Sequence, residues 1–149
     1  MSIEALLKKD VNSHTEKKNN LTYLSWAWAW QEALKADPTA TYKVEMFGDK
    51  CFMDINGTAM VFVTATMFGK PMTCQLPVMD YRNKAIPTPD AFAVNTAIMR
   101  CMTKALALHG LGLYIFAGED LPEEGRSVVI TPTQGATDNI PMEELRYLE

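Results

Sequence analysis

The run TAMVFVTATMF at residues 58–68 is the longest stretch of this 149-residue chain that is typical of a β-strand. It is rich in β-branched and aromatic residues, which favour the extended backbone. Asn56-Gly57 just before it is a strong hairpin signal, and GKP at residues 69–71 turns the chain back after it. These features predict the central strand of an antiparallel sheet.

Three neighbouring segments complete the expected sheet. TYKVEMF (41–47) alternates in its pattern, CFMDI (51–55) is a short strand before the hairpin signal, and MTCQLPVM (72–79) follows the turn. Together with residues 58–68, they predict an antiparallel β-meander of three main strands and a short one.

A helix is expected before the sheet. SWAWAWQEALKA (25–36) begins with a serine suited to an N-cap and contains strong helix formers, and it ends before the Asp-Pro pair at 37–38. At about 100° per residue, one face should point to the core. That face carries Trp26, Ala29, Trp30, Ala33 and Leu34. Trp28 falls on the other side with Glu32 and Lys35, so it needs a second partner.

A longer helix is expected over residues 91–109, after a loop at 80–90 that holds two prolines and four charged residues. Asp90 can cap its start, and Gly110 can end it. Its apolar stripe is Ala91, Val94, Ile98, Cys101, Met102, Ala105 and Leu108. Another face carries Thr96, Arg100, Thr103 and Lys104. The apolar residues 110–118 are expected to form a short strand or a docked turn.

Composition divides the chain into three parts. Residues 1–20 form a polar N-terminal arm, mobile or looped from residue 9, with four basic and three acidic residues. Residues 21–118 form one domain with eight basic and seven acidic residues, and residues 119–149 form an acidic linker and tail with two basic and eight acidic residues. The expected fold class is α+β: an N-terminal helix, an antiparallel meander of three to four strands, and a long helix packed on the sheet.

Several classes of protein are disfavoured by the same composition. No apolar run approaches the ~20 residues of a membrane span, and the N-terminus lacks the order of a signal peptide. Cys51, Cys74 and Cys101 are odd in number and far apart, which predicts reduced core residues in a cytosolic protein. With only His14 and His109 beside them, no zinc-ligand spacing and no Ser/His/Asp set is present. We expect no cofactor, no metal and no catalytic residue.

One alternative keeps an enzyme open. Asp80, Asp90, Glu119 and Asp120 could hold a divalent metal for phosphodiester cleavage. Their spacing matches no metal motif, and the favoured interpretation is that they are loop and cap carboxylates.

The residues best suited to bind a polyanion lie on the long helix and the loop before it. Arg100 and Lys104 are one turn apart, and the loop adds Arg82, Asn83 and Lys84. If the loop folds over the helix, these groups converge on one strip suited to phosphate contacts. The alternative is a solvated helix face or pairing with a nearby aspartate. Tyr81 could stack on a base or anchor the loop, and Trp28 could form a subunit contact, which we favour, or a stacking platform.

Three stretches carry a resemblance to a known family. They are NLTYLSWAWAWQEALK (20–35), LPVMDYRNKAIP (76–87) and NTAIMRCMTKALALHGLGLYIFAGEDLP (95–122), with the order of strands between them. The chain resembles the Sak-type single-strand annealing proteins of bacteriophages, which are distantly related to the eukaryotic single-strand annealing recombinases. The resemblance covers roughly residues 20–122 and leaves out the tail.

The resemblance implies a non-enzymatic protein that anneals complementary single strands without ATP during phage recombination, in the cytoplasm of the infected host. Such proteins form rings or arcs that hold single-stranded DNA and the annealed duplex intermediate. The family's basic positions correspond here to Arg100 and Lys104 and to the loop residues 82–84, with Thr96 and Thr103 beside them. Thr103 and Ala107 occupy turns where more distant relatives carry further cations, which shifts binding toward many weak contacts across an oligomer.

Partners and alternatives follow from the same comparison. A host single-strand-binding protein and a phage exonuclease are candidate partners, and no membrane is involved. The acidic tail could compete for the DNA site or dock a partner. The other two hypotheses are a metal-dependent nuclease and an oligomeric interaction module without a DNA role.

Overall fold

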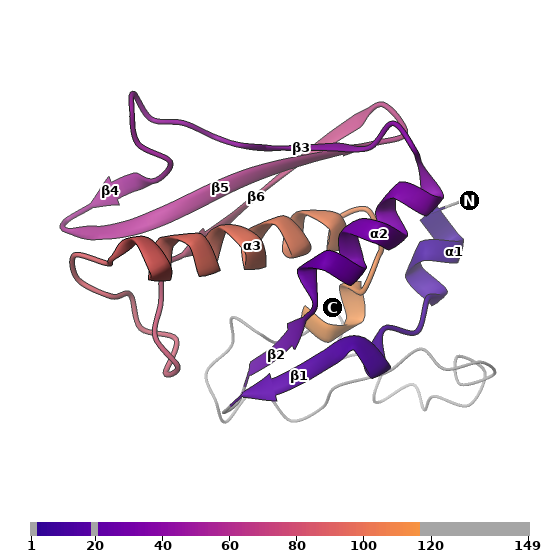
Figure 1. Ribbon diagram of the computed structural model, residues 1–149, viewed down its shortest axis with the longest axis horizontal. Coiled ribbons are helices and arrows are strands. Elements are labelled where there is room, and N and C mark those ends of the chain that lie inside the picture. Colours follow the sequence, from indigo (N-terminus) through magenta and orange to yellow (C-terminus); the bar gives the residue numbers. More distant parts are fainter. Residues whose placement is uncertain (1–2, 19–20, 117–149) are drawn as a thin grey trace, which may run out of the picture.

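The computed structural model describes residues 3–18 and 21–116 (Figure 1). In chain order, the elements are α1 (Ile3–Lys8), the 3₁₀ helix η1 (Asn12–His14), β1 (Thr15–Lys18), β2 (Leu21–Leu24), α2 (Trp26–Ala36), β3 (Thr41–Val44), β4 (Met53–Ile55), β5 (Thr58–Met67), β6 (Lys70–Pro77), α3 (Ala91–Ala107) and the 3₁₀ helix η2 (Leu113–Phe116). The predicted tail at 119–149 lies outside the described residues.

The expected α+β fold is confirmed. β5 pairs antiparallel with β6 along one side and with β3 and β4 along the other. Every second residue of β5 is buried under the helices: Ala59, Val61, Val63, Ala65 and Met67. α3 packs on β5 and β6 along one face of the sheet, and α2 packs on α3 (Figure 1).

The long helix is close to the prediction. Val94, Ile98, Cys101, Met102 and Ala105 are buried as expected. Ala91 and Leu108, at the two ends of the stripe, are exposed. Just after the helix, the Nε2–H of buried His109 donates to the Ala65 carbonyl at 2.9 Å, because a carbonyl oxygen can only accept.

The cysteines carry no disulfide. Cys74 and Cys101 lie in the core, whereas Cys51 is half-buried and packs against it. A hydrogen bond with the Cys74 side chain and burial raise the pKa of the Cys101 thiol. The Cys101 thiol therefore remains protonated and unreactive.

The predicted core face of α2 is wrong in part. The buried residues are Ala29, Glu32 and Ala33, whereas Trp26 is 46% exposed and Leu34 is also exposed. The small alanine side chains let α2 approach α3 closely, and the larger side chains of Trp26 and Leu34 lie at the edge of this contact. Trp30 stays half-buried and packs edge-on against Tyr42, with ring centroids 5.2 Å apart.

Glu32 is buried because two lysines neutralise it. Lys9 Nζ lies 2.9 Å and Lys35 Nζ 3.0 Å from its carboxylate oxygens. Burial alone would raise the pKa of Glu32, but the hydrogen bonds and charges of the two lysines outweigh it and leave the pKa lowered. The burial of Glu32 could not be predicted from helical periodicity, because its partner Lys9 comes from the segment before the hairpin.

The predicted loop at residues 9–20 is wrong over its described part. Residues 12–18 form η1 and β1, and β1 pairs with β2. Leu6 and Val11 belong to the same core as the sheet and α3. Residues 110–118 form the predicted docked turn, as η2, over their described part.

Two glycines after α3 make room for this N-terminal segment. A Cβ on Gly110 would lie 3.2 Å from the Ile3 carbonyl oxygen, and one on Gly112 would lie 3.1 Å from a Leu24 methyl carbon. Both glycines also have positive φ angles, at 115° and 70°. Each position therefore needs glycine for space and for backbone conformation.

Tyr114 fastens the same segment. Its hydroxyl accepts from the Val11 N–H at 3.1 Å and donates to Asn12 Oδ1 at 2.8 Å. Burial raises the pKa of Tyr114, so the hydroxyl keeps its proton.

Replacing Tyr114 with Phe should lower the free energy of unfolding by about 1–3 kcal/mol, because the buried Val11 N–H loses its acceptor. Urea unfolding measures the change. Tyr42→Phe is the matched control, since Tyr42 is 39% exposed. An equal loss in both variants would contradict the role given to the Tyr114 hydroxyl.

Candidate functional site

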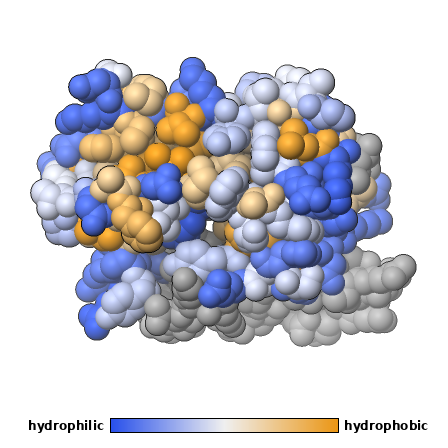
Figure 2. Space-filling view, viewed as in Figure 1, coloured by the Kyte–Doolittle hydropathy of each residue, from blue (hydrophilic) through white to orange (hydrophobic). Residues whose placement is uncertain are grey.

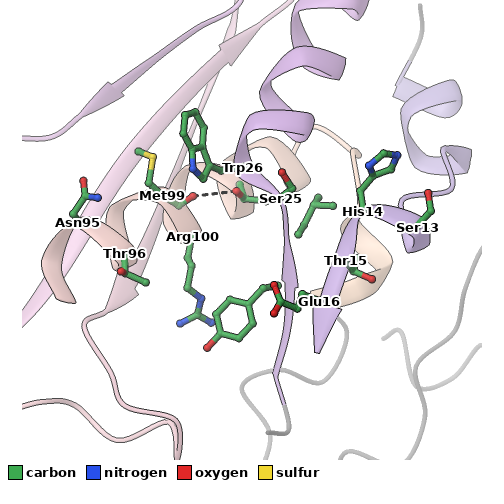
Figure 3. Close-up of a pocket in the computed structure, with 13 residues that line it drawn as sticks. Ser13, His14, Thr15, Glu16, Ser25, Trp26, Asn95, Thr96, Met99 and Arg100 are labelled. Carbon is green, nitrogen blue, oxygen red and sulfur yellow. Dashed lines mark hydrogen bonds between the residues drawn. The ribbon is translucent and has the colours of Figure 1, made fainter. Parts of the chain in front are cut away.

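A groove of about 520 Å³ lies between the β1–β2 hairpin and α3 (Figure 3). Its walls come from η1 and the hairpin, from the start of α2, and from the face of α3 turned away from the sheet. The lining residues are Ser13, His14, Thr15, Glu16, Tyr23, Leu24, Ser25, Trp26, Asn95, Thr96, Met99, Arg100 and Thr103. The hairpin is thus one side of a channel whose other side is the long helix.

Among the described residues that line this groove, Arg100 carries the positive charge. Its guanidinium carbon lies 4.7 Å from the centre of the Tyr23 ring, a cation–π contact between α3 and β2. Figure 3 shows the side chain reaching from α3 into the space beside the hairpin. A guanidinium stacked in this way can still direct N–H donors from its edge toward phosphate oxygens.

Two aromatic side chains line the groove. Trp26, at the first position of α2, is 46% exposed and lines the groove together with Tyr23. Rings of this kind are stacking partners for unpaired bases. Ser25 positions Trp26 by capping α2, since its hydroxyl oxygen accepts from the Trp28 N–H at 3.3 Å.

Trp28 has an intramolecular partner. Its ring stacks on His14 with centroids 4.0 Å apart and planes 10° apart, and it packs against the core. This stack fixes η1 to α2 at the rim of the groove. The subunit contact through Trp28 stays a prediction.

The predicted residues of the long helix divide into three groups. Thr96 is exposed and lines the groove with Arg100. Thr103 also lines it but is only 3% exposed, and its hydroxyl donates to the Met99 carbonyl at 3.0 Å. Lys104 is half-buried and is not among the lining residues.

The predicted loop residues lie elsewhere. Tyr81, Arg82, Asn83 and Lys84 do not line the groove, so the structure does not bring all the predicted groups onto one strip. Figure 1 shows the loop below the start of α3, on the side away from the sheet. The Arg82 guanidinium carbon sits 5.2 Å from the centre of the exposed Tyr81 ring, which gives this loop a cationic and aromatic surface of its own.

Asp80 shapes this loop. One carboxylate oxygen accepts from the N–H groups of Arg82, at 2.8 Å, and Lys84, at 3.1 Å. These two backbone hydrogen bonds, that from Lys84 first, lower the pKa of Asp80.

The carboxylates of the nuclease hypothesis have structural roles where the structure describes them. Asp80 orders the loop, and Asp90 caps α3 by accepting from the Ala93 N–H at 2.8 Å. Glu119 and Asp120 lie outside the described residues. Within residues 3–18 and 21–116, no three His, Cys, Asp or Glu side chains are grouped so as to hold a metal ion.

Comparison with known families decides the class. A family model described as "Sak Single Strand Annealing Protein" matches residues 2–144. The chain belongs to this family. The match reaches further than the resemblance at 20–122, and it takes in most of the N-terminal segment and of the tail. Searches of curated proteins and of solved structures gave no match.

Membership of the Sak family implies single-strand annealing in recombination, and therefore binding of single-stranded DNA. No helix in the described part of the chain has the length and apolar run needed to cross a bilayer. The groove adds Tyr23, Trp26 and His14 to the residues that the sequence indicated. These three residues could not be predicted from the local sequence, because residues 9–20 carry no strand pattern and tertiary packing brings the three against α3.

Strong acidification should loosen the loop at 80–84. A lowered folded-state pKa means that the Asp80 carboxylate stabilises the loop above the ordinary pKa of about 3.9, and that this contribution is lost as the pH falls through the lowered value. The amide NMR shifts of Arg82 and Lys84 should follow this titration. In Asp80→Asn they should be independent of pH, and an unchanged titration in that variant would refute the assignment.

Proposed function

We propose that the groove between the hairpin and α3 binds single-stranded DNA and that the protein anneals complementary strands without ATP, as an oligomer. The observation that supports this best is the stack of Arg100 on Tyr23, beside the exposed Trp26. It combines a phosphate-binding cation with base-stacking surface, which is how proteins hold single strands without reading their sequence.

The small number of cations in the groove supports the oligomeric part of the proposal. Among the described side chains that line it, Arg100 faces one carboxylate, that of Glu16. Hydroxyl and amide groups such as those of Thr96 and Asn95 can donate to phosphate oxygens, but they add no charge. One protomer therefore binds weakly, and many protomers on one strand supply the affinity.

The loop residues Tyr81, Arg82, Asn83 and Lys84 are proposed to contact the strand outside the groove. Lys104 is proposed to add to the positive potential of α3. No nucleotide hydrolysis is needed, because pairing of complementary strands is itself favourable by about 1.4 kcal/mol per base-pair step. The protein has only to reduce repulsion between the strands and leave the base edges free.

Annealing of two labelled complementary oligonucleotides tests the proposal. Faster annealing without ATP or metal supports it, metal-dependent shortening of the strands would indicate a nuclease, and no effect on either would leave an interaction module. Arg100→Ala should weaken single-strand binding by about 10- to 150-fold, since a charge-assisted hydrogen bond contributes about 1.5–3 kcal/mol. Adding Lys104→Ala should weaken it further.

Two controls separate charge from geometry. Lys43→Ala removes one cation from the exposed side of β3, away from the groove, and should leave affinity unchanged. Arg100→Lys keeps the charge but loses the planar stack on Tyr23, and should bind with intermediate affinity. Wild-type binding by a folded Arg100→Ala, Lys104→Ala variant would remove both residues from the site.

The acidic tail is proposed to compete with DNA for the groove or to dock a host single-strand-binding protein or a phage exonuclease. Its net charge of −6, from two basic and eight acidic residues, motivates both ideas. Deleting residues 123–149 should raise DNA affinity or abolish partner binding. If the deletion changes neither, the tail has neither role.

A further inference from the structure

Large apolar side chains are exposed at both ends of the long axis of the molecule. At one end, a β4-end patch comprises Met53, Ile55 and Phe92. At the other, an α1-end patch comprises Ile3, Leu7, Leu34, Phe68 and Leu108. Figure 2 shows apolar side chains over the half of the molecule that holds β4, with a smaller group toward the α1 end.

Phe92 dominates the β4-end patch. It lies in the first turn of α3 and is 81% exposed. The loop before α3 is tied to the turn between β4 and β5, because the Thr88 N–H donates to the Gly57 carbonyl at 2.8 Å. This bond keeps the start of α3 beside the tip of the sheet, so Phe92 and Ile55 belong to one surface.

The α1-end patch is held together in a similar way. Gly110 packs against Ile3 and Leu7, which brings the chain after α3 next to α1. Asp37, just after α2, accepts from the Phe68 N–H at 2.6 Å and so joins the β5–β6 turn to the end of α2. Figure 1 shows α1, the end of α2 and the β5–β6 turn at the same end of the molecule.

We propose that the β4-end patch of one protomer docks on the α1-end patch of a second copy, head to tail. The inference rests on the proposed oligomeric annealing function and names its interface. A head-to-tail assembly of identical copies needs two different surfaces on each copy, and the two apolar patches lie at opposite ends. A single foreign partner would need only one apolar patch. Such an assembly closes into a ring or extends as a filament.

The exposed area suits this occupant. A Phe side chain buries about 150–250 Å² when fully covered, and Phe92 is 81% exposed, so this residue alone offers roughly 150 Å² of apolar surface. A standard interface buries about 800 Å² per partner, of which somewhat more than half is apolar. The two patches therefore supply part of the apolar area of one standard interface, with Phe92 as the most exposed contributor.

Pairing of sheet edges is a weaker way to assemble. Pro71 and Pro77 pair with Thr66 and Met60 of β5, and neither can donate a hydrogen bond. Along a strand, the backbone N–H and C=O groups of every second residue point to the same side. The backbone groups at positions 71, 73, 75 and 77 therefore point away from β5, and two of these four residues are prolines without an N–H donor. Prolines of this kind protect an edge from strand addition.

End-to-end docking also explains how the grooves could join. α3 runs along the long axis in Figure 1 and forms one wall of the groove. Its 17 residues span about 25 Å. Copies added at the two ends would place successive grooves along one path for a single strand.

Mixing of two variants that are each blocked at one end tests the interface. Phe92→Asp blocks the β4 end, and Ile3→Asp blocks the α1 end. Both place an acid in the first turn of a helix, where it is tolerated. Leu34→Glu is a second block at the α1 end, and Met46→Asp is the control, because Met46 is 55% exposed outside both patches. Masses are measured by light scattering with and without homothymidine strands of 15 and 60 nucleotides.

Wild type and Met46→Asp should form large assemblies, and each blocked variant should be a monomer. An equal mixture of Phe92→Asp and Ile3→Asp should give a dimer and nothing larger. Phe92→Asp keeps an intact α1-end patch and Ile3→Asp keeps an intact β4-end patch, so only these two patches can dock. Blocked variants should keep wild-type affinity for the short strand but lose about 100-fold in affinity for the long one.

Assemblies of unchanged mass, no dimer in the mixture, or a monomeric wild type on the long strand would each overturn the proposal. Failure of the proposed function gives a different result, in which the wild type binds neither strand whatever its mass.

Discussion

The groove depends on one long-range attachment. Residues of η1 and the hairpin can form a wall only if the N-terminal segment is held against the chain that follows α3. Tyr114 supplies the polar part of that attachment through Val11 and Asn12, and Gly110 and Gly112 supply the close approach. More than 100 residues separate Tyr114 from its partners. The wall is therefore a product of tertiary packing, and the isolated segment has too few residues to form it alone.

The parts of the fold that the sequence predicted well are those in which local pattern and burial agree. β5 alternates because one face lies under α3, and α3 has a clear cap at Asp90 and a long apolar stripe. α3 packs mainly on β5 and β6, so the periodicity seen in both sequences reflects the one interface between this helix and the sheet.

Prediction failed where one element serves two interfaces. α2 meets α3 through its alanines and the N-terminal segment through Glu32, so its buried face is neither uniformly apolar nor where hydropathy places it. The site shows the same limit. Arg100 and Thr96 could be predicted from one helix face, but Tyr23 and Trp26 join them only because the hairpin folds back over residues some 75 positions later. No local sequence pattern indicates which distant residues the hairpin will contact.

The weak binding proposed for each groove is compatible with annealing. If Arg100 provides one charge-assisted contact of about 1.5–3 kcal/mol over a 25 Å path, several nucleotides share it, and each is held by less than the roughly 1.4 kcal/mol that a base-pair step returns. A complementary strand can then compete for the bases without removing the protein first. A groove with many cations would hold a single strand too tightly for this exchange. The balance of one arginine and one glutamate among the described lining residues therefore fits the proposed binding of one strand by many copies.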